Sequence, residues 1–467
     1  MKPPRKTLRQ PFGGVERVHF IGIGGAGMSG IAAVLLSLRY QVTGSDLKAS
    51  EVTDRLAHMG AKLHFGHKAS HVAGADVVVY SAAVPPDNLE VLEAQRRSIP
   101  VIPRTEMLAE LMRLKYGIAV SGTHGKTTTT SMIGLVMTEA RLDPTLVIGG
   151  QVDLFKSNAK LGKGDYLVAE ACEAFGEFFL LSPMVSVITN IDDDHLDYYG
   201  SIDKVRDAFT AFANKVPFYG CVILGIDDGQ VRRILPQVKR RVVTYGLAPD
   251  AQVAARKVRL EKAGTIFDLV FHGRKLGRVE LKVPGRFNLK NALAAAAVGL
   301  ELKVPFGKIA AGLGRFVGAQ RRFEVKGSYK GAVVVDDYAH HPTAVSETLR
   351  AAKHFAGNRK LMVVFQPHLY SRTQLLRDKF GKSFSDADEV VVAAIYPSRE
   401  KPIAGVTGMT VVEALRENRH PDARLIEDRT ALLEYLKGRL DGGYVLVTMG
   451  AGDIWKVGSD LVQKHKG

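Results

Sequence analysis

Short apolar runs alternate along this chain with longer stretches in which apolar residues recur at helical spacing. The first run covers residues 18–21 and is followed by a glycine-rich turn, a helical stretch over 28–39 and a second run over 41–45. Similar runs cover residues 76–81, 116–120, 165–169, 185–189, 331–335, 360–365, 389–395 and 444–449. Strands that alternate with helices are typical of parallel sheets, so the predicted fold class is α/β.

The length of 467 residues exceeds what one hydrophobic core usually holds. At about 150 residues per domain, it suggests three domains. The first alternating pattern breaks down after the proline-bounded residues 99–103, and the second closes near Gly318. We therefore predict domains over residues 1–105, 106–318 and 319–467.

The first glycine-rich turn reads Gly22-Ile23-Gly24-Gly25-Ala26-Gly27 and separates a predicted strand from a predicted helix. This G-x-G-x-x-G pattern lets backbone amides approach a pyrophosphate at the start of the helix. Asp46 closes the next predicted strand, where a carboxylate could reach a ribose hydroxyl. The pattern alone leaves open both NAD and another nucleotide diphosphate, such as a UDP-sugar.

The second turn reads Gly122-Thr123-His124-Gly125-Lys126-Thr127 and also leads from a predicted strand into a predicted helix. Backbone amides, the positive end of the helix and the lysine ammonium can converge there on phosphate oxygens, and the Thr127 hydroxyl can ligate Mg²⁺. Val120 stands where a full Walker A motif has its outer glycine. The turn predicts a site for a nucleoside triphosphate.

More polar side chains follow other predicted strands of the middle domain. Glu170 comes directly after the run over 165–169, with Glu173 close behind, and both are placed to hold Mg²⁺ directly or through water. Asn190 and His195 follow the run over 185–189. The asparagine offers a donor and an acceptor to an adenine edge, and the imidazole can bind a metal or a phosphate.

In the last domain, polar clusters follow the predicted strands in the same way. They cover residues 336–342, 366–373 and 450–453. Because ligands collect at the carboxyl ends of parallel strands, we expect these clusters to line a binding site.

Composition favours an ordinary globular protein, with 46% hydrophobic and 24% charged residues. No apolar run approaches the roughly 18 residues of a membrane span, and the basic start lacks the apolar stretch of a signal peptide. Cys172 and Cys221 are the only cysteines, too few for a disulfide framework. We therefore expect a cytoplasmic protein that does not insert into membranes.

The net charge of +16 raises the possibility of a nucleic-acid partner. The basic residues are spread along the chain, with short clusters at residues 2–9, 232–241 and 321–330 and no accompanying nucleic-acid motif. We expect a solvated basic surface and anionic small substrates, without nucleic acid.

The order and spacing of seven motifs over about residues 17–455 resemble the Mur ligase family, and most closely its alanine-adding members. These motifs are HFIGIGGAGMSGIA, GTHGKTTTT, TNIDDDHLDYYGS, VPFYG, DDYAHHPTAV, FQPHLYSRT and MGAGDI. The resemblance implies a Rossmann-like N-terminal domain that binds a UDP-sugar, a central P-loop domain that binds ATP, and a Rossmann-like C-terminal domain that closes on ATP and binds the amino acid.

The resemblance also implies a reaction, with ATP and Mg²⁺ as cofactors. L-Alanine would be joined to UDP-N-acetylmuramate through an acyl phosphate, as the first amino-acid addition in peptidoglycan precursor synthesis. The two substrates would be the partners, and the enzyme would be a monomer or a weak homodimer.

Motif position further implies which residues act. The catalytic set would be Lys126, Glu170, His195, His368 and Arg372. ATP would contact Gly122, Thr123, His124, Gly125, Lys126, Thr127, Thr128, Asn190, Asn291, Asp337 and Tyr338. The UDP-sugar would contact Gly24, Gly25, Ala26, Gly27, Met28, Ser45, Asp46 and Ser81, and the metal would contact Thr127, Glu170 and His195.

This chain departs from the family pattern at several positions. Residues 172–175 read CEAF where relatives often have DESD, which leaves Glu173 as the one candidate for a second carboxylate ligand. Leu369 replaces a second arginine of some relatives, and Phe287 replaces a common histidine. Lys215 lies near the carbamylated lysine of sister ligases, and we assign it no role.

Three other functions compete with this interpretation. The nearest is the recycling ligase that joins the same UDP-sugar to an intact tripeptide, although the FQPHLYSRT motif favours the alanine enzyme. An NAD-dependent dehydrogenase would explain the first glycine turn but not the second. A basic P-loop protein acting on nucleic acid would explain only the second turn and the charge.

Overall fold

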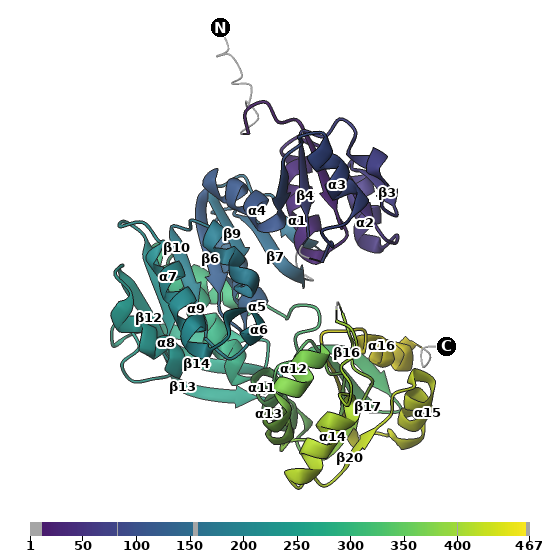
Figure 1. Cartoon of the computed structure of the whole chain (residues 1–467). Coiled ribbons are helices and arrows are strands. Elements are labelled where there is room, and N and C mark those ends of the chain that lie inside the picture. Colours follow the sequence, from purple (N-terminus) through teal and green to yellow (C-terminus); the bar gives the residue numbers. More distant parts are fainter. Residues whose placement is uncertain (1–11, 82, 153–156, 399, 464–467) are drawn as a thin grey trace. The chain divides into compact units, whose positions relative to one another are not determined.

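The computed structural model describes residues 12–81, 83–152, 157–398 and 400–463, which form three β-sheets with their helices (Figure 1). The chain divides into two compact units. One unit extends to Ala254 and includes Val270–Leu276 and Asn291–Leu313; the other contains Ala255–Leu269, Gly277–Lys290 and the chain from Gly314 onward. The predicted α/β class is confirmed.

The first sheet, purple in Figure 1, has five strands in the order β3-β2-β1-β4-β5. All of its strand pairs are parallel, and β1 pairs with β2 on one side and with β4 on the other. The carboxyl end of β1 is therefore a topological switch point, where α/β sheets bind ligands. Its elements are β1 (Arg17–Ile21), α1 (Ala26–Ser37), β2 (Gln41–Asp46), α2 (Glu51–His58), β3 (Lys62–Phe65), η1 (Ala69–Val72), β4 (Val77–Tyr80), α3 (Leu89–Arg96) and β5 (Val101–Pro103).

The second sheet has ten strands in the order β15-β14-β13-β12-β11-β10-β6-β9-β7-β8. Strand β6 pairs in parallel with β9 and β10, so the carboxyl ends of these three strands meet at one edge. The strands are β6 (Tyr116–Ser121), β7 (Thr145–Val152), β8 (Ser157–Lys160), β9 (Tyr166–Glu170), β10 (Val185–Ile188), β11 (Cys221–Gly225), β12 (Val242–Gly246), β13 (Val253–Glu261), β14 (Gly264–Phe271) and β15 (Arg274–Leu281). The helices are α4 (Arg104–Arg113), α5 (Lys126–Glu139), η2 (Ala174–Leu180), α6 (Leu196–Tyr199), α7 (Ile202–Asn214), α8 (Gly229–Ile234), η3 (Leu235–Gln237), α9 (Arg286–Glu301) and α10 (Phe306–Gly314).

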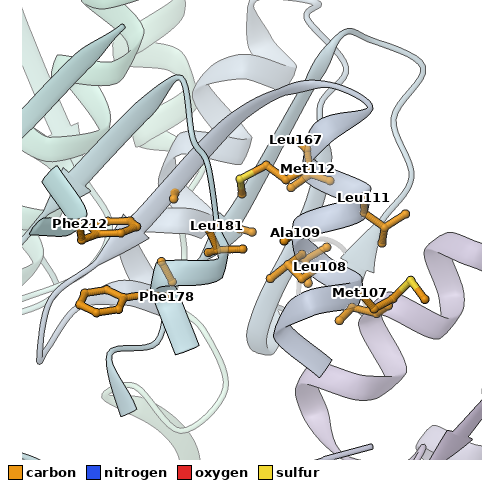
Figure 2. Packing of buried hydrophobic residues seen from close by; sticks show 14 of the residues in the cluster. Met107, Leu108, Ala109, Leu111, Met112, Leu167, Phe178, Leu181 and Phe212 are labelled. Carbon is orange, nitrogen blue, oxygen red and sulfur yellow. The ribbon is translucent and has the colours of Figure 1, made fainter. Parts of the chain in front are cut away.

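Helix α4 packs one apolar face into the hydrophobic core of the first unit (Figure 2). Met107, Leu108 and Met112 recur at helical spacing on that face and are almost fully buried. Nearby, the Phe178 and Phe212 rings stack with centroids 4.7 Å apart. Burying each such side chain stabilises the fold by about 1.5–3 kcal/mol, so the cluster holds α4 against this core.

The third sheet, in the second unit, has the order β16-β17-β21-β18-β19-β20. Only the β16–β17 pair is antiparallel, and the polar clusters predicted after the strands follow β17, β18 and β21. Its elements are β16 (Glu324–Tyr329), β17 (Ala332–Asp337), α11 (Pro342–Ala356), β18 (Lys360–Phe365), α12 (Tyr370–Leu375), α13 (Arg377–Lys382), β19 (Glu389–Val392), α14 (Gly408–Glu417), β20 (Ala423–Leu425), α15 (Arg429–Arg439), β21 (Tyr444–Met449) and α16 (Trp455–Gln463).

The predicted elements differ from the observed ones mainly at their ends. The helix predicted over 28–39 spans Ala26–Ser37, because the end of the glycine turn already forms the first helical turn and the Ser29 N–H donates to the Gly25 carbonyl. The strand predicted over 389–395 ends at Val392. Within the described chain, no helix has the length and apolar character needed to cross a membrane.

Candidate active site

The turn between β6 and α5, the phosphate loop, spans residues 122–125. Gly122 and Gly125 have φ angles of 122° and 85°, which side chains other than hydrogen rarely tolerate. A Cβ atom on Gly122 would lie 2.1 Å from Thr189 Oγ1. The loop thus takes its shape from the two glycines, and Gly125 sits at the N-cap of α5. The amides at the start of α5 form an anion-binding terminus.

The segment after β10 holds the phosphate loop through hydrogen bonds to His124. Asn190 Oδ1 accepts from the His124 N–H at 2.8 Å, and Asn190 Nδ2 donates to the His124 carbonyl at 3.0 Å. Thr189 Oγ1 donates to the same carbonyl at 2.6 Å. Asp192 Oδ2 lies 3.2 Å from His124 Nε2. Asn190 therefore supports the loop in this structure, and its predicted contact with adenine stays a prediction.

Lys126, the first residue of α5, turns its ammonium back over the loop. Its Nζ donates to the Gly122 carbonyl at 2.6 Å and to the Thr123 carbonyl at 3.2 Å. Both Glu173 carboxylate oxygens accept from it, at 3.0 and 2.9 Å. Burial lowers the pKa of this lysine, but the attraction of Glu173, followed by that of Cys172, outweighs burial and leaves the pKa raised. The ammonium is therefore charged at the point where a phosphate would arrive.

The three predicted metal ligands all follow strands of the second sheet. Thr127 is buried directly after Lys126. Glu170 ends β9, beside Val120 of β6, and its Oε1 accepts from the Gly149 N–H at 2.6 Å. His195 has a left-handed φ of 57° at the start of α6, and its N–H donates to Asp194 Oδ1 at 2.9 Å. All three belong to the first unit, and their joint role as a metal site stays a prediction.

Asn291 of α9 lies beneath the phosphate loop. Its Oδ1 accepts from Thr129 Oγ1 at 3.2 Å and would be 2.4 Å from a Cβ atom on Gly125. The side chain is buried, as is that of Thr128. Asn291 thus packs against the first turn of α5, where it helps to exclude any residue larger than glycine at position 125.

The first glycine turn lies at the switch point of the first sheet. Hydrogen bonds join it to the last residues of β2. The Gly22 and Ile23 N–H groups donate to the Ser45 carbonyl at 2.9 and 3.0 Å, and the Gly24 N–H donates to Asp46 Oδ2 at 2.8 Å. Ser81 follows β4 and lies against Gly22, where a Cβ atom would be 3.6 Å from Ser81 Cβ. Ser45, Asp46 and Ser81 thus contact the backbone of this turn, and the binding of a UDP-sugar by these residues stays a prediction.

Two residues next to this turn escaped the sequence analysis. Arg104 Nη1 would be 1.9 Å from a Cβ atom on Gly27, so its guanidinium lies against the turn, 3.6 Å from Glu177 Oε2. Glu90 is fully buried and accepts from Ser45 Oγ at 2.6 Å, while His19 Nε2 lies 3.0 Å from it. No sequence signal points to Arg104, because it follows the segment over 99–103 where the first alternating pattern breaks down, and the partners of Glu90 are too distant along the chain to suggest it.

In the second unit, Asp337 ends β17 and Tyr338 directly follows it. Both Asp337 oxygens accept backbone hydrogen bonds, from Phe323 at 2.7 Å and Ala339 at 2.8 Å, and burial raises the pKa of this carboxyl group. The Arg321 and Arg322 guanidinium carbons each lie 4.9 Å from the centre of the Tyr338 ring. Asp337 orders the loop that carries Tyr338, and the contacts of both with ATP stay predictions.

His368 and Arg372, on the loop after β18 and on α12, point to each other. Arg372 Nη1 donates to His368 Nδ1 at 3.1 Å, and the His368 ring stacks on Tyr396 with centroids 5.8 Å apart. Glu400 Oε2 accepts from the Ser371 N–H at 3.0 Å, at the start of α12. The second unit thus brings together the two predicted residues of the amino-acid site.

Three family models match consecutive parts of the chain. The Mur ligase family catalytic domain matches residues 17–116, the Mur ligase middle domain matches residues 120–299, and the Mur ligase glutamate ligase domain matches residues 321–452. Together with the two glycine turns and three α/β sheets, these matches define the class, and the chain belongs to the Mur ligase family.

Individual relatives agree with this assignment. The chain is 51% identical to the UDP-N-acetylmuramate–L-alanine ligase of Geobacter sp. strain M21, over 97% of this chain and 99% of the relative. It is also 51% identical to the ligase of that name from Geobacter sulfurreducens, over 97% and 98%. Among solved structures, the UDP-N-acetylmuramate-alanine ligase of Thermotoga maritima matches with a TM-score of 0.82 and 30% identity, over 96% of this chain and 99% of that one.

Proposed function

We propose that this chain is an ATP-dependent ligase that joins L-alanine to the lactyl carboxylate of UDP-N-acetylmuramate, the first amino-acid addition in peptidoglycan precursor synthesis. The observation that carries the proposal is the 51% identity, over nearly the whole of both chains, to a ligase named for these substrates. The TM-score of 0.82 to the Thermotoga maritima ligase agrees with it. The tripeptide recycling ligase is not favoured.

In this reaction a carboxylate oxygen of the sugar attacks the γ-phosphorus of ATP, ADP leaves, and an acyl phosphate forms. The free amine of alanine then attacks the acyl carbon, phosphate leaves, and the nitrogen loses a proton to solvent. Because both reactants of the first step are anions, the site must supply fixed positive charge where they meet. Lys126 and the amides at the start of α5 are the groups of this chain that supply it.

Mg²⁺ is the metal that we propose for the phosphate site, where it would neutralise charge on the triphosphate. Thr127, Glu170 and His195 would hold it with a hydroxyl, a carboxylate and an imidazole. The Thr127 hydroxyl and the Glu170 carboxylate are oxygen donors, which suit Mg²⁺. Thr127 lies just after the phosphate loop, and Glu170 ends β9, the strand that pairs with β6.

The remaining contacts are assigned by chemistry. The glycine turn at residues 22–27 and Asp46 would bind the UDP portion of the sugar, because the turn offers amides to a diphosphate. Arg372 would hold the carboxylate of alanine, since a guanidinium can donate two parallel hydrogen bonds to it. We keep residues 1–105, 106–318 and 319–467 as the domains that carry these three sites.

The deciding experiment measures phosphate release from ATP with purified protein and UDP-N-acetylmuramate, with and without L-alanine. The proposal expects release that depends on both substrates. A parallel assay replaces alanine with the tripeptide L-Ala-γ-D-Glu-meso-diaminopimelate. Turnover with the tripeptide alone would replace the proposal with the recycling ligase, and turnover with neither would reject both.

A further inference from the structure

The Lys126 ammonium is fully engaged by the protein itself. Two loop carbonyls accept from it, at 2.6 and 3.2 Å, and both Glu173 oxygens complete its shell at 3.0 and 2.9 Å. The exposed fractions of the two side chains are 16% and 3%. A phosphate oxygen that binds the Lys126 ammonium therefore has to compete with the buried Glu173 carboxylate.

Glu173 is held in position by its own backbone. Its carbonyl accepts from the Tyr199 hydroxyl at 2.5 Å and from the Gly176 N–H at 3.0 Å. The following residues, Phe175 and Gly176, both have left-handed φ angles of 55° and 68°, which close a tight turn. Two hydrogen bonds and this turn fix the backbone of Glu173, so the flexible four-carbon lysine side chain is the partner better able to move.

The pair has a clear electrostatic consequence. A carboxylate and a phosphate cannot both be satisfied by one ammonium without repelling each other at short range, and the repulsion is strong where water is excluded. A nucleotide phosphate that accepts a hydrogen bond from the ammonium therefore competes with Glu173 for it, as it does with the two loop carbonyls. A hydrogen bond between charged groups is stronger than one between neutral groups, so its loss on nucleotide binding lowers the nucleotide affinity.

We propose that Glu173 is the resting partner of Lys126, a positioning residue whose carboxylate holds the ammonium over the phosphate loop until a nucleotide phosphate takes its place. This inference rests on the proposed function only in that Lys126 binds a nucleotide. It assigns to Glu173 a role in the enzyme before ATP arrives, separate from the metal role considered for it from the sequence.

The test is equilibrium binding of ADP in the absence of divalent metal, by isothermal titration with the full-length protein. Glu173→Gln keeps the shape and an acceptor but removes the charge, and we expect it to bind ADP about tenfold more tightly than the wild type, a change of about 1.4 kcal/mol. Glu173→Asp keeps a carboxylate and should stay within about twofold of the wild type. Glu110→Gln removes an exposed carboxylate of α4 that pairs with Arg113, and it should leave affinity unchanged.

A purely structural role predicts the opposite sign, because a loosened loop binds more weakly. Equal or weaker ADP binding by a Glu173→Gln protein that melts at the wild-type temperature would overturn the inference. If that variant does not fold, Tyr199→Phe provides the second test. It removes one of the two hydrogen bonds to the Glu173 carbonyl, and we expect ADP affinity to rise about two- to fivefold, whereas an unchanged or lower affinity would overturn the inference. Failure of the wild type itself to bind ADP would instead reject the proposed function.

Discussion

The side-chain amide of Asn190 and the backbone of His124 form a reciprocal pair, with Asn190 Oδ1 accepting at 2.8 Å and Nδ2 donating at 3.0 Å. Asn190 follows β10 and His124 lies in the phosphate loop after β6, and these two strands are parallel neighbours. The carbonyl and the amino group of one side-chain amide therefore both hydrogen-bond to the phosphate loop. They connect it to the segment that follows the adjacent strand.

Asn190→Ala should raise the KM for ATP about tenfold, because two hydrogen bonds that fix the loop are lost at roughly 0.5–1.5 kcal/mol each. Steady-state titration of ATP at saturating UDP-N-acetylmuramate and alanine measures the change. Asn214→Ala removes a half-buried amide that donates to the Gln237 carbonyl, and it serves as the control. An unchanged KM would show that the loop holds its shape without Asn190.

Lys126→Ala should lower turnover by about 10²–10³-fold, since it removes the fixed charge nearest the developing negative charge of phosphoryl transfer. Single-turnover formation of ADP with the sugar substrate measures this step directly. The variant should also be less stable, because Glu173 is left buried without its ammonium partner, so turnover is measured at a temperature at which the variant is folded. A near-normal rate would refute the assignment of the loop to ATP.

Arg104→Ala should raise the KM for UDP-N-acetylmuramate about tenfold and leave the KM for ATP within twofold, because the guanidinium lies against Gly27 of the diphosphate turn. Substrate titrations at saturating ATP separate the two constants. Arg113→Ala, at the exposed end of the same helix, is the matched control. Equal rises in both constants would indicate a structural role for Arg104 through its ion pair with Glu177.

The sequence predicts the strand-turn-helix units at both glycine turns because periodicity, glycine and lysine are local signals. The sequence cannot predict which residue becomes the hydrogen-bond partner of a given polar side chain. Asn190 contacts His124, which the sequence does not suggest because the contact depends on β10 lying beside β6, and its predicted contact with adenine stays a prediction. Glu90 is 71 residues from His19 and gains its buried position only when β1 and α3 meet in the fold.

Asp336 gives a prediction about pH. Burial raises its pKa to about 6 despite Arg321, whose Nε lies 3.2 Å away. The pKa of Asp336 is therefore higher in the folded than in the unfolded protein, and the folded protein binds its proton more tightly. Protonated Asp336 favours folding, fully so below about pH 4. This contribution is lost as the pH rises through 6. The shift corresponds to about 3 kcal/mol as an upper bound.

Asp336→Asn should therefore remove part of the pH dependence of stability. The melting temperature of the wild type relative to the variant should fall between pH 4.5 and pH 7.5, and the loss should be complete by about pH 7.5. Thermal unfolding of both proteins in matched buffers measures this difference. A constant difference across that range would mean that Asp336 does not titrate between these values.

Arg372 provides the test of the amino-acid site. Arg372→Ala should raise the KM for L-alanine by about 10- to 100-fold, because the bidentate partner of the substrate carboxylate is lost, while the KM for ATP stays within twofold. Arg372→Lys keeps the charge without the planar pair of donors and should fall between the wild type and the alanine variant. Alanine titrations at fixed ATP separate these cases, with Arg377→Ala, a half-buried arginine paired with Glu417, as the control. If Arg372→Ala instead lowered turnover with no change in the alanine KM, the guanidinium would act on the reacting groups and another residue would hold the carboxylate.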